Sequence, residues 1–114
     1  MKIYEVLSWL LIVMLAIAFI GRIFIAYINP EVFLVGEKLG GDKARIYLLG
    51  NALASIFLAA LLLKKNYWMG TVLTTLYFGY NVYEGYIFYQ TITPFTLLSL
   101  IIPILTLISL KLDI

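Results

Sequence analysis

The sequence predicts an all-α polytopic membrane protein, in which four transmembrane helices form an antiparallel bundle and a short interfacial helix joins the first and second spans. Of the 114 residues, 64% are hydrophobic and only 12% are charged, and the mean hydropathy is +1.05. A soluble domain carries about 25% charged residues, and one this small has too much surface to hide so many apolar side chains. The apolar residues also fall into four runs separated by short polar breaks.

Each run approaches the length of roughly 20 residues that crosses a bilayer core. We place the four spans of this single domain, residues 1–114, at about residues 6–28, 46–63, 67–89 and 93–110. Only Arg22 interrupts the first run. The start of this run resembles a secretory signal peptide with Ala16 and Ala18 at its cleavage site, but apolar residues continue to Ile28. We therefore expect an uncleaved membrane helix.

Turn and capping residues predict the connection after the first span. Asn29-Pro30-Glu31 is a helix-start pattern, with Asn as the cap, Pro at the first position and an acid near the positive end of the helix dipole. We expect a short helix over residues 30–41, which Gly40-Gly41 ends, after which Asp42 caps the second span. This segment is too short to cross a bilayer, so it should lie at the membrane surface.

The later connections are shorter. Lys64-Lys65-Asn66 predicts a tight turn that makes the second and third spans an antiparallel pair. Thr93-Pro94 repeats the cap-and-proline start for the fourth span. Pro103 should kink that span because it removes a backbone donor. The positive-inside rule favours cytoplasmic N- and C-termini, and we expect an integral protein of a prokaryotic plasma membrane.

Missing residue types exclude several classes of function. The chain has no Cys and no His, which excludes disulfides, thiol nucleophiles, iron–sulfur ligation and His-ligated metal or haem. The serines have no base beside them, and Glu84 is the sole acidic residue deep in a span. We therefore expect no catalytic residues, no metal and no cofactor. The net charge of +2 is too small to indicate a nucleic-acid partner.

Three spans place a polar residue at a shared depth. Arg22 lies six residues before the end of its span, and Asn51 and Glu84 lie five residues from the ends of theirs, roughly 8–9 Å inside the same boundary. A charge in hydrocarbon costs on the order of 2.5–3.5 kcal/mol at the midplane. We therefore predict an Arg22–Glu84 ion pair in the membrane. Asn51 and Asn81 are its expected hydrogen-bond partners.

Three interpretations of this polar cluster stay open. Arg22 snorkels toward water with its charge unpaired, or the ion pair only locks the bundle, or the cluster binds or moves a ligand. The third span adds Tyr77, Tyr80 and Tyr83, which lie deeper than an interfacial aromatic belt. Their hydroxyls need partners if they are buried. The three rings predict either a stacking pocket for a flat ligand such as a quinone ring or packing against neighbouring subunits.

Several features match one family of membrane proteins. The first span ends with Gly21-Arg22 and Asn29-Pro30-Glu31, a hydrophilic loop follows, and the second span opens with Leu-Leu-Gly-Asn before a Leu- and Ala-rich run to Leu63. In these features the chain resembles the DoxX-like four-helix membrane proteins over most of its length. That family often has an acid where Asn51 stands. The resemblance implies association with membrane redox or quinone-linked assemblies and transfers no activity.

The small size, the lack of catalytic groups and the short loops favour a non-catalytic accessory or structural subunit of a larger membrane complex. Its expected partners are membrane lipids and either other membrane subunits or further copies of itself. The alternative is a small transporter, ion pore or hydrophobic-ligand-binding bundle that uses Arg22, Asn51, Asn81 and Glu84. Glu84 could carry a proton in such a bundle, because burial favours the neutral form of a carboxyl group.

Overall fold

Four α-helices and a two-stranded β-hairpin make up the chain in the computed structural model, which describes residues 1–28, 31–34, 37–89 and 94–114. In chain order the elements are α1 (Ile3–Ile28), β1 (Glu31–Leu34), β2 (Glu37–Gly40), α2 (Gly41–Leu63), α3 (Tyr67–Tyr89) and α4 (Pro94–Leu112). The prediction of four helices is confirmed. The bounds of α3 are the predicted ones, whereas α1 and α2 begin before residues 6 and 46.

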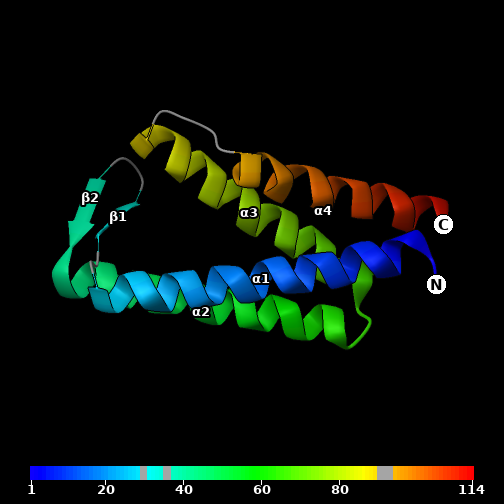
Figure 1. The fold of residues 1–114 in the computed structure, drawn as a ribbon, viewed down its shortest axis with the longest axis horizontal. Coiled ribbons are helices and arrows are strands. Elements are labelled where there is room, and N and C mark those ends of the chain that lie inside the picture. The colour runs from blue at the N-terminus through cyan, green and yellow to red at the C-terminus, as the bar shows by residue number, and fades with distance from the viewer. Residues whose placement is uncertain (29–30, 35–36, 90–93) are drawn as a thin grey trace.

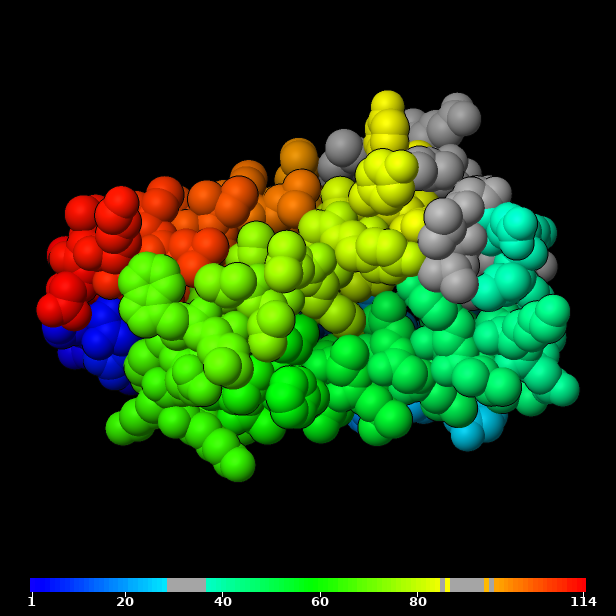
Figure 2. All heavy atoms as spheres, turned by 180° about the vertical axis from the view of Figure 1, so that it is seen from behind, coloured from blue at the N-terminus to red at the C-terminus, as the bar shows by residue number. Residues whose placement is uncertain are grey.

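The helices alternate in direction along the long axis of the molecule (Figure 1). The N- and C-termini therefore meet at one end, the terminal end, and the hairpin lies at the other, the hairpin end (Figure 1). α1 packs mainly against α2 and α4, and α3 packs mainly against the same two helices. α1 and α3 are thus diagonal members of the bundle. From the side of α2 and α3, almost all of α1 is hidden (Figure 2).

The core of the bundle contains an apolar cluster in which Leu11, Leu15, Leu58, Leu62 and Phe78 pack together. Hydroxyl side chains share this interior. Those that are buried on the four helices are Ser8, Ser55, Thr71, Thr74, Ser99, Thr106 and Ser109. Small residues of this kind let apolar helices approach closely in a membrane.

Large apolar side chains also cover the outer surface of all four helices. Ile20 of α1, Leu53 of α2, Leu76 of α3 and Ile104 of α4 are between 49% and 68% exposed. α1 and α2 are long and apolar enough to cross a membrane, and only 22% and 33% of their most apolar windows are buried. Because the core helix of a soluble protein is mostly buried, this exposure is typical of helices that contact lipid.

The predicted interfacial helix over residues 30–41 is wrong, because the described part of this segment forms a β-hairpin. β1 and β2 pair in antiparallel fashion, with Glu31 opposite Gly40 and Leu34 opposite Glu37. β1 contains Val32 and Phe33, which suit a strand better than a helix. Two residues separate the strands, as in the tightest hairpins. The expected cap at Asn29-Pro30 and the link at 35–36 lie outside the described residues.

The glycine pair begins α2 and does not end a helix. Gly40 is the N-cap of α2 with an extended backbone, and no side chain caps this end. Gly41 has a φ of 61°, which lies in the left-handed region that glycine adopts without strain. Asp42 lies in the first turn of α2, where a negative charge favours the helix dipole, so the prediction that it is the cap is wrong.

The turn between α2 and α3 has the predicted position. The Asn66 amide donates to the Leu61 carbonyl at 3.1 Å, and Lys65 has a φ of 62°. α3 then begins with a bond of 2.9 Å from the Gly70 amide to the Asn66 carbonyl. The left-handed backbone of Lys65 reverses the chain, and the amides of Lys65 and Asn66 satisfy carbonyls at the end of α2. α2 and α3 are consequently antiparallel neighbours, as predicted.

α4 begins at Pro94, in agreement with the proline start that the sequence predicts. The expected cap Thr93 lies outside the described residues. Pro103 is buried inside α4, and the helix continues through it to Leu112. Near this proline the Thr106 hydroxyl donates to the Ile102 carbonyl at 2.8 Å. The kink at Pro103 stays a prediction.

Candidate functional site

Two asparagines and a tyrosine join α2 to α3 in the half of the bundle nearer the hairpin. Asn51 donates from Nδ2 to Oδ1 of Asn81 over 3.3 Å. The Tyr77 hydroxyl donates to Oδ1 of Asn51 and lies 3.2 Å from the Asn51 main-chain oxygen. Asn81 Nδ2 donates to the Tyr77 carbonyl at 2.7 Å. Together with Arg22, which contacts Tyr77, these three residues are named the Asn51 network.

Arg22 reaches this network across the diagonal of the bundle. Its guanidinium lies 5.5 Å from the centre of the Tyr77 ring, within the range of a cation–π contact. It also donates to the Ala18 carbonyl of its own helix at 3.3 Å. The positive charge is therefore stabilised by a ring face and a carbonyl dipole.

The predicted Arg22–Glu84 ion pair is not found among the described residues. The ion pairs found among the described residues join Lys2 to Asp113 and Arg45 to Asp42. The Arg22 side chain extends back along α1 toward Ala18 and meets Tyr77, which lies on α3 about 10 Å before Glu84. The Tyr77 ring, which projects from α3, occupies the position next to Arg22 that the carboxylate was expected to take.

Glu84 belongs to a second group, one turn beyond Tyr80 on α3. Its side chain is buried, with 6% of the residue exposed. The Tyr80 hydroxyl interacts with the Glu84 carboxylate and with Tyr47 of α2. These three residues are named the Glu84 group. Sequence reasoning missed Tyr47, although it precedes Asn51 by four residues and therefore shares its face of α2.

The three tyrosines of the predicted aromatic pocket do not converge. Tyr77 points into the bundle and contacts Asn51, whereas Tyr80 is 40% and Tyr83 61% exposed. A step of three residues rotates the side chain by about 300° around a helix, so each ring lies roughly 60° from the one before it. The spacing that suggests a pocket thus turns the rings from the interior to the outer surface.

Two polar residues outside the predicted cluster, Arg45 and Ser55, also lie between helices. Arg45 donates from Nε to the Ala26 carbonyl at 3.0 Å and lies 5.9 Å from the Tyr27 ring, so it ties the start of α2 to the end of α1. Ser55 is fully buried beside Tyr77 and donates to the Ala52 carbonyl at 2.9 Å. Its position four residues after Asn51 predicts the same face of α2.

The chemistry that these groups offer is hydrogen bonding, cation–π contact and proton binding at one carboxyl group. Within the described ranges, no set of three His, Cys, Asp or Glu side chains is arranged to hold a metal ion. Most donors of the Asn51 network already meet acceptors on another part of the same network. The arrangement is that of an interhelical cross-link, with Glu84 as a separate protonatable group beside it.

Comparison of the chain with protein-family models, with curated proteins and with solved structures finds no match. The resemblance to the DoxX-like proteins stays a prediction. Functional interpretation therefore depends on the geometry of the bundle itself.

Proposed function

We propose that this chain is a four-span integral membrane protein. The length of the molecule supports this assignment, because its longest dimension of 45 Å matches a bilayer of about 40–45 Å with its headgroup regions. The outward apolar side chains of all four helices support it as well. Cations and acids at the terminal end, and the polar hairpin strand β2 at the other, would then meet the two aqueous boundaries.

Within the membrane, we propose that the protein is a non-catalytic accessory subunit of a larger complex. The observation that carries this function is that the Asn51 network connects α1, α2 and α3 to each other. Interhelical hydrogen bonds of this type stabilise a membrane bundle by about 0.6–2 kcal/mol each. The polar residues in the interior therefore serve the stability of the bundle, and the function lies on its outer surface.

The outer surface of α3 carries the best candidate for a contact with another subunit. Tyr80, Tyr83 and Tyr86 are 40%, 61% and 52% exposed along the half of α3 nearer the hairpin. Tyrosine at the very end of a span suits the lipid headgroup region, but Tyr80 and Tyr83 lie deeper. A phenol hydroxyl that faces hydrocarbon needs a partner. A neighbouring polypeptide would supply that partner for Tyr83.

Photocrosslinking in native membranes tests this surface. With p-benzoylphenylalanine at Tyr83, we expect one discrete adduct with another protein after irradiation. The control places the same amino acid at Ile104, which is 49% exposed on α4 and has no polar group that needs a partner. An adduct of twice the mass of the chain at Tyr83 would assign the surface to a second copy. Lipid adducts alone at both positions would contradict the accessory-subunit proposal.

The Glu84 group favours a second candidate function, the movement of protons or a small cation. A carboxyl group that is 6% exposed in an apolar helix is more often functional than structural. Its neighbours Tyr80 and Tyr47 provide hydroxyls that could take part in proton transfer. We expect Glu84 to be the group that carries the proton in this alternative.

Proteoliposomes with an internal pH-sensitive dye separate the two functions. A transporter would dissipate an imposed pH gradient, and Glu84→Gln would abolish that flux while Glu5→Gln, at the terminal end, would leave it unchanged. Equal flux in wild type and Glu84→Gln would exclude the carboxylate role. Gradients that persist in the wild type as long as in empty liposomes would leave the accessory subunit as the function.

A further inference from the structure

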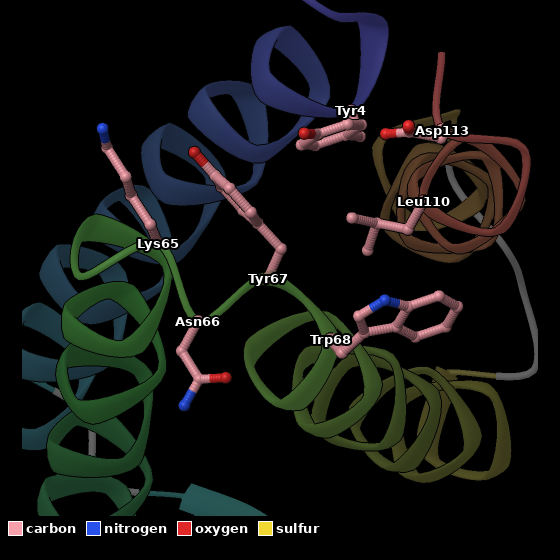
Figure 3. A pocket seen from close by; sticks show the side chains of 7 residues that line it. All are labelled: Tyr4, Lys65, Asn66, Tyr67, Trp68, Leu110 and Asp113. Atoms are coloured by element: carbon pink, nitrogen blue, oxygen red, sulfur yellow. The ribbon is translucent and has the colours of Figure 1, made fainter.

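A pocket of about 290 Å³ opens at the terminal end of the bundle (Figure 3). Three helix ends and one turn contribute to its wall. The residues that line it are Tyr4 of α1, Lys65 and Asn66 of the turn between α2 and α3, Tyr67 and Trp68 of α3, Leu110 of α4 and Asp113 beyond α4. The pocket lies far from the Asn51 network and from the Glu84 group, which occupy the half of the bundle near the hairpin.

Contacts between distant parts of the chain hold this wall in place. The rings of Tyr4 and Tyr67 meet edge to face with 5.2 Å between their centres. Lys2 pairs with Asp113 at 2.6 Å and lies 5.7 Å from the centre of the Tyr4 ring. The hydrogen bond to Asp113 raises the pKa of Lys2 above its usual value. Asp113 is therefore already neutralised from within the chain.

Lys65 is the positive charge that the wall presents to a ligand. Among the described residues its ammonium group meets no carboxylate, in contrast to Lys2. The Lys65 ammonium lies at the edge of the pocket, on the other side of the Tyr67 ring from Trp68 (Figure 3). Positive side chains outnumber acidic ones at this end, namely Lys2, Lys64, Lys65 and Lys111 against Glu5 and Asp113. A ligand with a negative charge would complement this surface.

The depth of the pocket in the bilayer indicates that this ligand is a membrane lipid. The ends of helices that cross a bilayer lie in the headgroup region, where Trp and Tyr side chains concentrate. Trp68 and Leu110 give the pocket an apolar side, and the nearby outer surface of α3 and α4 continues with Met69 and Leu112, which are 54% and 61% exposed. In a molecule with an anionic head and apolar tails, the head would match the charge of Lys65 and the tails would match the apolar outer surface of α3 and α4.

We propose that this pocket binds the phosphodiester headgroup of an anionic phospholipid. Lys65 supplies the charge for the phosphate, and the Trp68 indole N–H supplies a hydrogen-bond donor. Basic pockets between membrane helices commonly bind acidic headgroups. A zwitterionic lipid is a poorer ligand, since its ammonium group would compete with Lys2 for Asp113. This inference rests on the membrane placement in the proposed function.

Native mass spectrometry of the full chain in detergent tests the site, with phosphatidylglycerol and phosphatidylcholine as probes. We expect retention of one phosphatidylglycerol per chain. Lys65→Gln and Trp68→Leu should each weaken its apparent affinity about tenfold, which corresponds to the loss of one charge-assisted contact. The matched controls are Lys64→Gln, in the same turn but outside the pocket, and Trp9→Leu, on the outer face of α1, and neither should weaken the affinity more than about twofold.

Several results would overturn the proposal. Equal losses for Lys64→Gln and Lys65→Gln would mean that surface charge alone attracts the lipid, and equal retention of both lipids would mean that the phosphate charge is not recognised. Soluble glycerophosphoglycerol is added as a competitor in a further experiment. If it displaces phosphatidylglycerol at an equal concentration, the site binds a free phosphodiester and not a lipid. Extraction of the chain from membranes by alkaline carbonate would instead refute the membrane placement. The two failures are therefore distinguishable.

Discussion

Replacement of Gly70 by valine will destabilise the bundle by about 1–3 kcal/mol, the usual cost of overpacking a filled core. A Cβ atom on Gly70 would lie 2.8 Å from Cδ2 and 3.1 Å from Cγ of Leu62. Leu62 is 2% exposed and packs in the apolar core, so it has little room to move aside. The substitution therefore forces α2 and α3 apart next to the turn that joins them. Unfolding in detergent, followed by circular dichroism, measures the loss.

Gly79 provides the control on the same helix. A Cβ atom there meets no other atom within 4 Å, so valine enters open space. Glycine and valine differ by only a few tenths of a kcal/mol in helix propensity, so the difference between the two variants isolates the contact with Leu62. We expect Gly79→Val to unfold within about 0.5 kcal/mol of the wild type. Equal stability of the two variants would mean that α2 and α3 do not approach closely at Gly70.

Removal of the Asn51 side chain will have the second large effect. Asn51→Leu removes the side-chain acceptor of the Tyr77 hydroxyl and the donor to Asn81, and both residues lie in the half-buried interior. We expect a loss of about 1–2 kcal/mol. Tyr77→Phe removes the hydroxyl from the other side of the same bond. In a double-mutant cycle of these two changes, the coupling free energy should be about 1 kcal/mol, because each single change already breaks the shared hydrogen bond.

Tyr83 supplies a matched control for this cycle. Tyr83→Phe removes the same hydroxyl from the same helix, but the ring is 61% exposed and has no contact with Asn51 among the described hydrogen bonds. The combination of Asn51→Leu with Tyr83→Phe should be additive within about 0.5 kcal/mol. Coupling as large for Tyr83 as for Tyr77 would contradict the network and indicate a general rearrangement of α3.

The outcome of the cycle also bears on function. A strong coupling between Asn51 and Tyr77 would support the view that the interior polar residues hold helices together. A weak coupling, with little loss of stability, would leave these buried groups available for a ligand and would favour the transport alternative. The flux measurement on Glu84→Gln then becomes the deciding experiment.

Much of the architecture was predictable from periodicity and composition. Apolar runs and polar breaks predict four helices, the position of the Lys64-Lys65-Asn66 turn and the bounds of α3. Helical spacing also predicts that Asn51 and Asn81 turn inward, and the structure brings them within 3.3 Å of each other. These features depend on short stretches of chain and on the preference of each residue for lipid or water, which the order of residues records directly.

The prediction of a short helix over residues 30–41 failed because a competing interaction decided the outcome. The pattern around Asn29-Pro30-Glu31 is common to helix starts and to turns, and pairing between Glu31–Leu34 and Glu37–Gly40 selects the strand. Such pairing involves backbone groups on two segments, which no single capping pattern reports. The choice between hairpin and helix therefore needed the arrangement of both segments in space.

The lateral arrangement of the helices was beyond the reach of the sequence. Counting residues along each span gives Arg22 and Glu84 a common depth, but depth says nothing about which helices are neighbours around the bundle. α1 and α3 are diagonal, and the Arg22 side chain, which extends back toward Ala18, meets the ring of Tyr77 two turns before Glu84 on α3. Axial position follows from a fixed rise per residue, whereas helix order follows from the packing of whole side-chain surfaces, and only the folded chain contains that information.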